Sequence, residues 1–134
     1  MKQLSELVTK LVKTYFKNIN AVAEEEDLTP MQMKILRILE NKDLIIQKEI
    51  ADKAYAEPAA VSRAIDGMSE KGLVKRNQSD ESRRCFEIEL TPFGVEKIAA
   101  INKKYAELEE RILKNLSGGE VEQLKCLLEK ILNI

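Results

Sequence analysis

Apolar residues recur every three or four positions along the start of the chain, which is the spacing of one face of an α-helix. The residues on this face are Leu4, Leu7, Val8, Leu11, Val12, Tyr15, Phe16 and Ile19. The acidic run Glu24–Asp27 follows them and is expected to end the helix. A second helix is predicted directly behind it and runs to about Glu40. There Thr29 suits the N-cap, Pro30 the first helical position, and Gln32 the return bond of a capping box.

The middle of the chain alternates short elements. Leu44–Ile46 reads as a short strand, and Gln47–Ala54 reads as a short helix. After a turn at Tyr55, a further helix is predicted from Pro58 to about Lys71. This helix places Val61, Ile65 and Met68 on one face, and Gly72 suits a left-handed cap at its end.

A β-hairpin is predicted next. Its strands are Leu73–Arg76 and Cys85–Leu90, and the turn-forming run Asn77–Asp80 lies between them. In the second strand Phe86, Ile88 and Leu90 alternate with Glu87 and Glu89, as expected when one face is buried. The adjacent Arg83 and Arg84 fall at the hairpin tip.

Two helices are predicted to complete the chain. Thr91-Pro92 starts the first, and the capping-box pattern Ser117–Glu120 starts the second. Apolar faces run along both helices: Val95, Ile98, Ile101, Tyr105, Leu108, Ile112 and Leu116, then Val121, Leu124, Leu127, Leu128, Ile131 and Leu132. The pattern as a whole predicts a mainly α protein with a small β-hairpin, an α+β fold.

Composition narrows the classes of function. A chain of 134 residues suits one domain, and no apolar run reaches the roughly 18 residues of a membrane span. The N-terminus is amphipathic rather than a signal sequence, so the cytoplasm is the expected location. Histidine is absent, which removes histidine-based catalysis and histidine metal sites. No phosphate-binding loop motif occurs, so we expect no enzyme, metal or cofactor.

The two cysteines are too far apart for a metal motif and are expected to be free thiols. Cys126 lies among leucines, where a buried thiol behaves as a small apolar group. The same packing role is favoured for Cys85 over an oxidation switch at the base of the hairpin.

Positive charge is concentrated locally. The net charge is −1, yet from Lys71 to Phe86 five basic residues face two acidic ones. Helix, turn, helix and hairpin in this order form a winged helix-turn-helix, whose second helix enters the major groove of DNA. The hairpin tip then reaches the minor groove, where Arg83 and Arg84 suit the narrow, electronegative site.

The same region resembles the MarR family of transcriptional regulators. The matching pieces are Leu28–Gln32, Glu49–Ala51, Ala60–Asp66, Glu70–Arg76, Arg83-Arg84 and Leu90–Gly94. The resemblance implies a homodimer that represses from a pseudo-palindromic operator and is released by a small lipophilic or phenolic effector. It also implies a single domain over 1–134, in which 28–91 form the DNA-binding lobe and 1–27 with 92–134 form the dimerisation region.

Carried onto this chain, the resemblance assigns DNA contacts. The recognition helix begins at Pro58, Ala59 and Ala60, nearest the base edges, and Arg63 is expected on guanine O6 and N7. The alternative for Arg63 is an ion pair with Asp66 or Glu70. The expected phosphate contacts are Ser62, Lys48, Lys53, Lys75, Arg76, Arg83 and Arg84. A ligand pocket would draw on Tyr15, Phe16, Tyr55 and Met68, all of which core packing explains equally well.

Two regions depart from the family pattern, the start of the recognition helix and the wing. Glu57, Ala59 and Ala60 stand where many members have serine or threonine, and Ser82 replaces the aspartate that usually precedes the wing arginine. These departures, with the slight acidity, motivate an alternative function: a winged-helix protein-interaction module with weak or no DNA binding.

Overall fold

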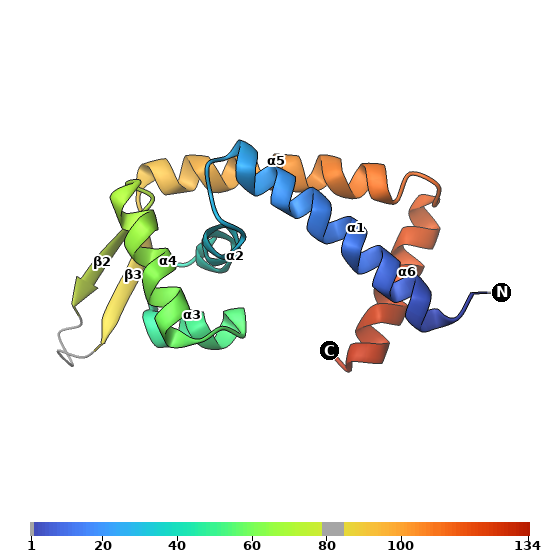
Figure 1. Cartoon of the computed structure of the whole chain (residues 1–134), viewed down its shortest axis with the longest axis horizontal. Coiled ribbons are helices and arrows are strands. Elements are labelled where there is room, and N and C mark those ends of the chain that lie inside the picture. The colour runs from blue at the N-terminus through green and yellow to red at the C-terminus, as the bar shows by residue number, and fades with distance from the viewer. Residues whose placement is uncertain (1, 79–84) are drawn as a thin grey trace.

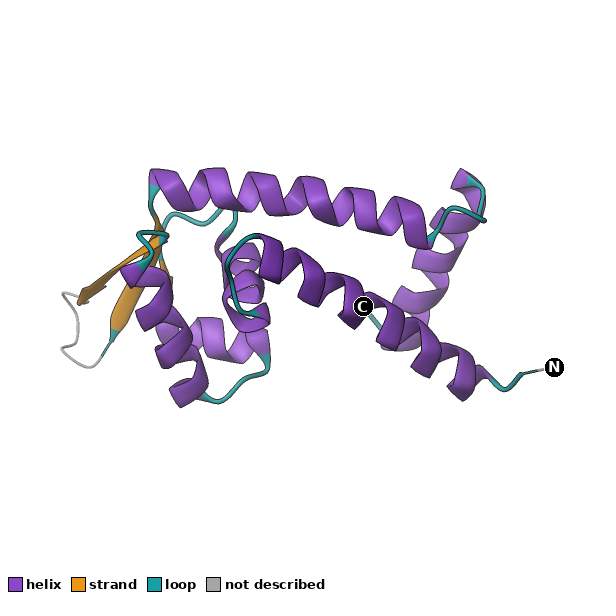
Figure 2. Ribbon diagram, turned by 45° about the horizontal axis from the view of Figure 1, so that its top comes forward, coloured by secondary structure: helices purple, strands orange, loops and turns teal. Residues whose placement is uncertain are grey.

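The computed structural model describes residues 2–78 and 85–134 of the chain. Over these residues the fold is mainly helical with one small sheet (Figures 1 and 2). The elements are α1 (Leu4–Glu25), α2 (Pro30–Leu39), β1 (Ile45–Ile46), α3 (Gln47–Ala54), α4 (Pro58–Glu70), β2 (Val74–Gln78), β3 (Phe86–Leu90), α5 (Pro92–Ile112) and α6 (Gly118–Leu132). The sheet is antiparallel in the order β1-β3-β2. The predicted fold class is therefore confirmed.

The helix starts follow the local signals in the sequence. Thr29 and Ser117 each close a capping box, with Gln32 and Glu120 as the returning side chains. Thr91 caps α5 by accepting a hydrogen bond from the amide of Gly94. These caps satisfy amides that have no partner inside the helix, so the predicted starts are confirmed.

The core lies where α2, α3 and α4 pack against the sheet, at the left of Figure 1. Val61, Ile65 and Met68 have no exposed surface on the inner face of α4, as the helical spacing predicts. Ile50 from α3 and Ile88 from β3 are equally buried. These side chains give α4 a fixed position under the outer surface of the lobe.

A close backbone approach joins the hairpin to α5. The Thr91 amide donates to the Leu73 carbonyl at 3.0 Å, and a Cβ on Gly94 would lie 2.1 Å from that same oxygen. Gly72 adopts φ 75°, the left-handed conformation predicted for the end of the recognition helix. Residues without a Cβ are required at both places, for space at one and for conformation at the other.

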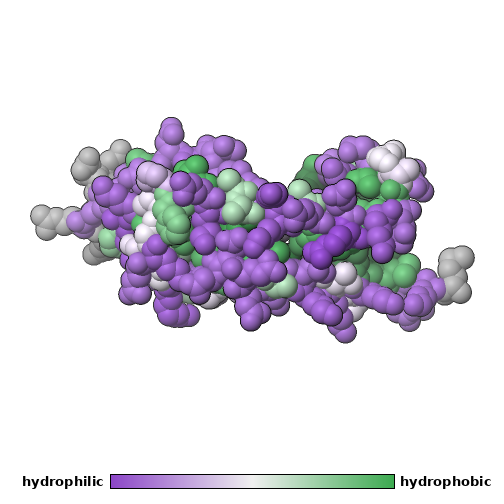
Figure 3. All heavy atoms as spheres, turned by 90° about the horizontal axis from the view of Figure 1, so that it is seen from above, coloured by the Kyte–Doolittle hydropathy of each residue, from purple (hydrophilic) through white to green (hydrophobic). Residues whose placement is uncertain are grey.

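The helices from the two chain ends extend away from this lobe (Figure 1). The helix α6 has no buried residue, and the apolar face of α1 is largely exposed. Figure 3 shows apolar atoms open to solvent at this end of the molecule. The exposed apolar side chains are Leu4, Leu7, Val8, Leu11, Val12, Phe16, Leu127, Leu128, Ile131 and Leu132.

Four expectations need correction. Asn77 and Gln78 belong to β2 rather than to a turn, because they pair with Glu87 and Phe86 of β3. Cys126 is exposed in the protomer, since the described chain leaves most of the apolar face of α6 uncovered.

Val95 is also exposed, at 54%, because the first turn of α5 packs against the hairpin through Gly94 instead. The long helix ends at Ile112, so Leu116 lies in the turn before α6. Among the described residues, no helix is long and apolar enough to cross a bilayer.

Candidate nucleic-acid interface

The recognition-helix candidate α4 is braced from behind by α2. Gln32 is a buried polar residue whose amide nitrogen reaches the Ala64 carbonyl at 3.4 Å. Its amide oxygen accepts from Lys71 at 3.1 Å, and Lys71 also donates to the carbonyl of Asp27. A Cβ on Gly67 would lie 2.6 Å from the Gln32 nitrogen, so the two helices approach closely. This packing fixes the C-terminal half of α4.

The outer face of α4 is open to solvent. Pro58, Ala59 and Arg63 are exposed, while Ala60 and Ser62 are half-buried. The guanidinium of Arg63 has no hydrogen bond or ion pair within the described residues. The alternative pairing of Arg63 with Asp66 or Glu70 is therefore not formed, and Arg63 is available for a ligand.

Arg76 is held inside the lobe instead. It donates one hydrogen bond to the Asp66 carboxylate and another to the Ser62 carbonyl at 3.2 Å. Its guanidinium also lies 5.3 Å from the ring centroid of Phe86 on β3, close enough for a cation–π contact. Arg76 thus links the recognition helix to the sheet, and a phosphate contact would compete with these bonds.

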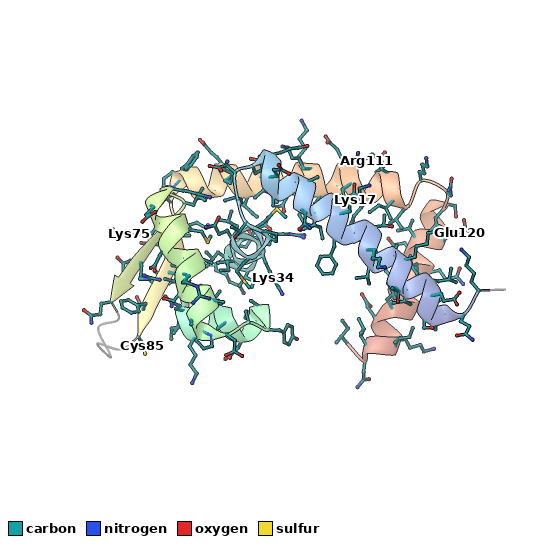
Figure 4. The ribbon with its side chains drawn as sticks, in the orientation of Figure 1. Lys17, Lys34, Lys75, Cys85, Arg111 and Glu120 are labelled. Atoms are coloured by element: carbon teal, nitrogen blue, oxygen red, sulfur yellow. The ribbon has the colours of Figure 1, made fainter. Side chains whose placement is uncertain are left out.

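The lysines expected to contact phosphates differ in whether they form ion pairs within the described chain. Lys48 and Lys75 are exposed and have no ion pair within the described chain, and Figure 4 shows Lys75 on β2. Lys53 pairs with Glu49 one helical turn earlier at 3.7 Å. Exposed pairs of this kind contribute little, so Lys53 is also available to a phosphate.

Arg83 and Arg84 lie outside the described residues. Their expected minor-groove contacts therefore stay predictions. The described chain resumes at Cys85, which is half-buried and directly precedes β3, at the end of that strand far from α5 (Figure 4).

Comparison with known proteins shows which proteins this fold and surface resemble. The family model of the MarR family matches residues 28–86, which span α2 to the start of β3. The repressor IacR of Pseudomonas putida is 26% identical over 117 residues, which cover 87% of this chain and 70% of IacR. A mutant of MarR from E. coli, solved in complex with operator DNA, aligns with a TM-score of 0.83 at 25% identity and covers 96% of this chain and 93% of that one. Apo MarR from E. coli aligns over 98% of both chains with a TM-score of 0.84 and 24% identity.

Residues 28–86 of this chain match the MarR family.

The four residues expected around a ligand are scattered over the structure. Phe16 lines an open cleft of about 600 Å³ between α1, α2 and α5. Met68 has no exposed surface and belongs to the core, whereas Tyr55 is 94% exposed in a left-handed turn. Tyr15 is half-buried on α1, and burial, followed by the nearby Glu109 carboxylate, raises the pKa of its hydroxyl.

The cleft has a feature that the sequence did not reveal. The Arg37 guanidinium stacks on the Tyr105 ring at 4.0 Å from its centroid, and both residues line the cleft. They come from α2 and α5, far apart in the chain, and no local pattern links them. The guanidinium carries a positive charge and several N–H donors, which suit the oxygen of an anionic or phenolic ligand.

The acidic run at the end of α1 is also structural. Lys104 of α5 bonds to the carboxylates of Glu25 at 2.8 Å and Glu26 at 2.9 Å, and Lys97 bonds to Glu26 at 3.3 Å. The hydrogen bond from Lys104 lowers the pKa of the Glu26 carboxyl against the opposing effect of burial. The sequence pattern had indicated only that a helix ends at this run.

Proposed function

We propose that this chain is a sequence-specific DNA-binding transcriptional regulator that inserts α4 into the major groove and lays its hairpin along the minor groove. The observation that carries the proposal is the solvent-facing side of α4. There Arg63 is exposed and has no partner among residues 2–78 and 85–134, while the opposite side of the helix is anchored to α2 and the sheet. A free guanidinium on a fixed helix is the usual reader of guanine O6 and N7.

The rival function, a protein-interaction module, is not favoured. The relatives described above are transcriptional regulators, and one is solved on operator DNA. The two functions differ in salt dependence. A dimer that neutralises about eight phosphates gives a slope near −7 for the logarithm of affinity against the logarithm of salt, whereas a protein-binding module gives weak association with any duplex.

The test is competition binding of the purified protein to genomic fragments, including the region upstream of its own gene, at two salt concentrations. We expect one fragment to be bound well above bulk DNA. Arg63→Ala should flatten that preference, and Arg84→Ala should weaken all binding together. Absence of any preference at low salt, without and with small phenolic ligands, would refute the proposal.

The regulator acts as a homodimer in this proposal. Its dimerisation region is 1–27 with 92–134, and its DNA-binding lobe is 28–91. The exposed apolar faces of α1 and α6 support this, because single large apolar residues are common on surfaces but contiguous stripes on two neighbouring helices favour a partner. A pseudo-palindromic operator with half-sites about one helical turn apart matches such symmetry.

Repression in the cytoplasm, relieved by a small lipophilic or phenolic effector, completes the proposal. IacR, which is similar to this chain, is named a transcriptional repressor, and this supports repression. The cleft over Arg37 and Tyr105 supports an effector site, with Phe16 at its edge. The test is release of bound operator by a panel of phenolic acids. The proposal fails for this cleft if Arg37→Met leaves the response to an active compound unchanged.

A further inference from the structure

The N-terminal tip of α4 carries one side chain that can hydrogen-bond. Glu57 is the N-cap residue and is exposed, and Pro58, Ala59 and Ala60 follow it. None of these three has a polar side-chain atom. Base recognition by the first turn of the helix therefore depends on methyl contacts and on the Glu57 carboxylate.

Nothing within the described chain accounts for a glutamate here. Its side chain makes no capping hydrogen bond to α4, although capping is the usual reason for an acidic residue at this position. It has no ion pair either, and the preceding cation, Lys53, is paired with Glu49. The positive end of the helix dipole favours an acidic side chain at this end of α4, which is where the helix would meet its ligand.

A carboxylate accepts hydrogen bonds and cannot donate them, which restricts the bases it tolerates. In the major groove guanine presents the acceptors O6 and N7, and thymine presents the acceptor O4. Adenine offers a donor beside the acceptor N7, whereas cytosine offers its N4 amino group. Glutamate therefore matches cytosine and is repelled by guanine at the same place.

We propose that Glu57 is a specificity-determining residue that selects cytosine at one position of each operator half-site. The inference rests on the proposed function, because it requires α4 to lie in the major groove. It adds a second contact, at the tip of α4, to the Arg63–guanine contact six positions further along the helix. The repulsion between Glu57 and nearby phosphates lowers affinity for bulk DNA, so the same side chain disfavours incorrect sequences.

The experiment is selection from a library of duplexes with randomised half-sites, read by sequencing. The parent protein is compared with Glu57→Gln, Glu57→Ala and the control Glu70→Gln. Glu70 is also exposed and unpaired within the described residues, and it ends the same helix, so its substitution makes the same charge change away from the tip. Thermal unfolding of all four proteins verifies that each is folded.

We expect the parent to prefer cytosine about 5-fold at one half-site position, the low end for one side chain–base contact. Glu57→Gln should move that preference to adenine, because an amide bonds to both N6 and N7. Glu57→Ala should abolish it, and both variants should bind bulk DNA more tightly. Glu70→Gln should keep the parental motif.

Two results would overturn the inference, and they are distinguishable. If the parent selects a motif and Glu57→Gln selects the same motif base for base, Glu57 does not read the operator and the proposed function stands. If the parent selects no motif at all, the proposed function fails and the inference fails with it.

Discussion

Replacing Gly94 by alanine tests the joint between the hairpin and α5. The added Cβ would lie 2.1 Å from the Leu73 carbonyl oxygen and 3.1 Å from a methyl group of Leu90. The oxygen belongs to the backbone of a residue with no exposed surface, so it cannot rotate aside as a flexible side chain would. The start of α5 must move away from the start of β2.

The magnitude follows from the steric clash and from the hydrogen bond that this movement breaks. Overpacking of a buried site costs about 1–3 kcal/mol, and the Thr91–Leu73 hydrogen bond contributes about 1 kcal/mol more. We therefore expect Gly94→Ala to lower the free energy of unfolding by about 2–4 kcal/mol. For a chain of this size that corresponds to a fall in Tm of roughly 10 °C.

The assay is urea unfolding together with calorimetry, at matched protein concentrations because the proposed dimerisation would make stability concentration-dependent. The control is Gly118→Ala. At Gly118 an added Cβ meets nothing within 4 Å, and alanine favours a helix over glycine by up to about 1 kcal/mol. The reasoning is refuted if Gly94→Ala unfolds at the parental urea concentration.

Three further substitutions probe other parts of the chain. Arg76→Ala should lower the free energy of unfolding by about 1–3 kcal/mol, because it removes the hydrogen bonds of a largely buried guanidinium. Asp66→Ala removes an exposed carboxylate and should lower it by under about 1 kcal/mol. Equal losses in urea unfolding would contradict this reasoning. The lowered pKa of Glu26 stabilises the fold above its ordinary pKa of 4.5, and this contribution disappears as the pH falls through the folded-state pKa. Between pH 5 and pH 3, the Tm of Lys104→Met should therefore fall less than the Tm of the parent. An equal fall in both proteins would refute the coupling. Leu128→Glu should shift sedimentation from dimer to monomer, and a persistent dimer would exclude α6 from the interface.

Local signals in the sequence were sufficient for most of the fold. Proline at the first helical position, hydroxyl N-caps and glycine in a left-handed cap act within a few residues, so Pro30, Thr91 and Gly72 could be interpreted without a structure. The buried face of α4 followed from helical spacing in the same way. Strand pairing was harder, because Gln78 is in β2 only through its partner Phe86.

Contacts between distant residues could not be predicted. The sequence offered Arg76 as a phosphate contact, since nothing local indicates that Asp66 and Ser62 would hold it. The stacking of Arg37 on Tyr105 likewise joins residues that are distant in the sequence, so no local pattern predicts it. Periodicity also predicts that α6 has an apolar face without saying whether the covering partner is the same chain or another.

The two ends of α4 have opposite physical roles. At its C-terminal end Lys71 bonds to Gln32 and to the carbonyl of Asp27, just after α1, and in the middle of α4 the carbonyl of Ser62 and the carboxylate of Asp66 hold Arg76. At its N-terminal end Glu57 makes no capping bond, and the first turn is exposed or half-buried. A change at the anchored end must break hydrogen bonds that stabilise the lobe, whereas a change at the tip breaks none. Operator preference can therefore change by substitution at the tip of α4 with little loss of stability.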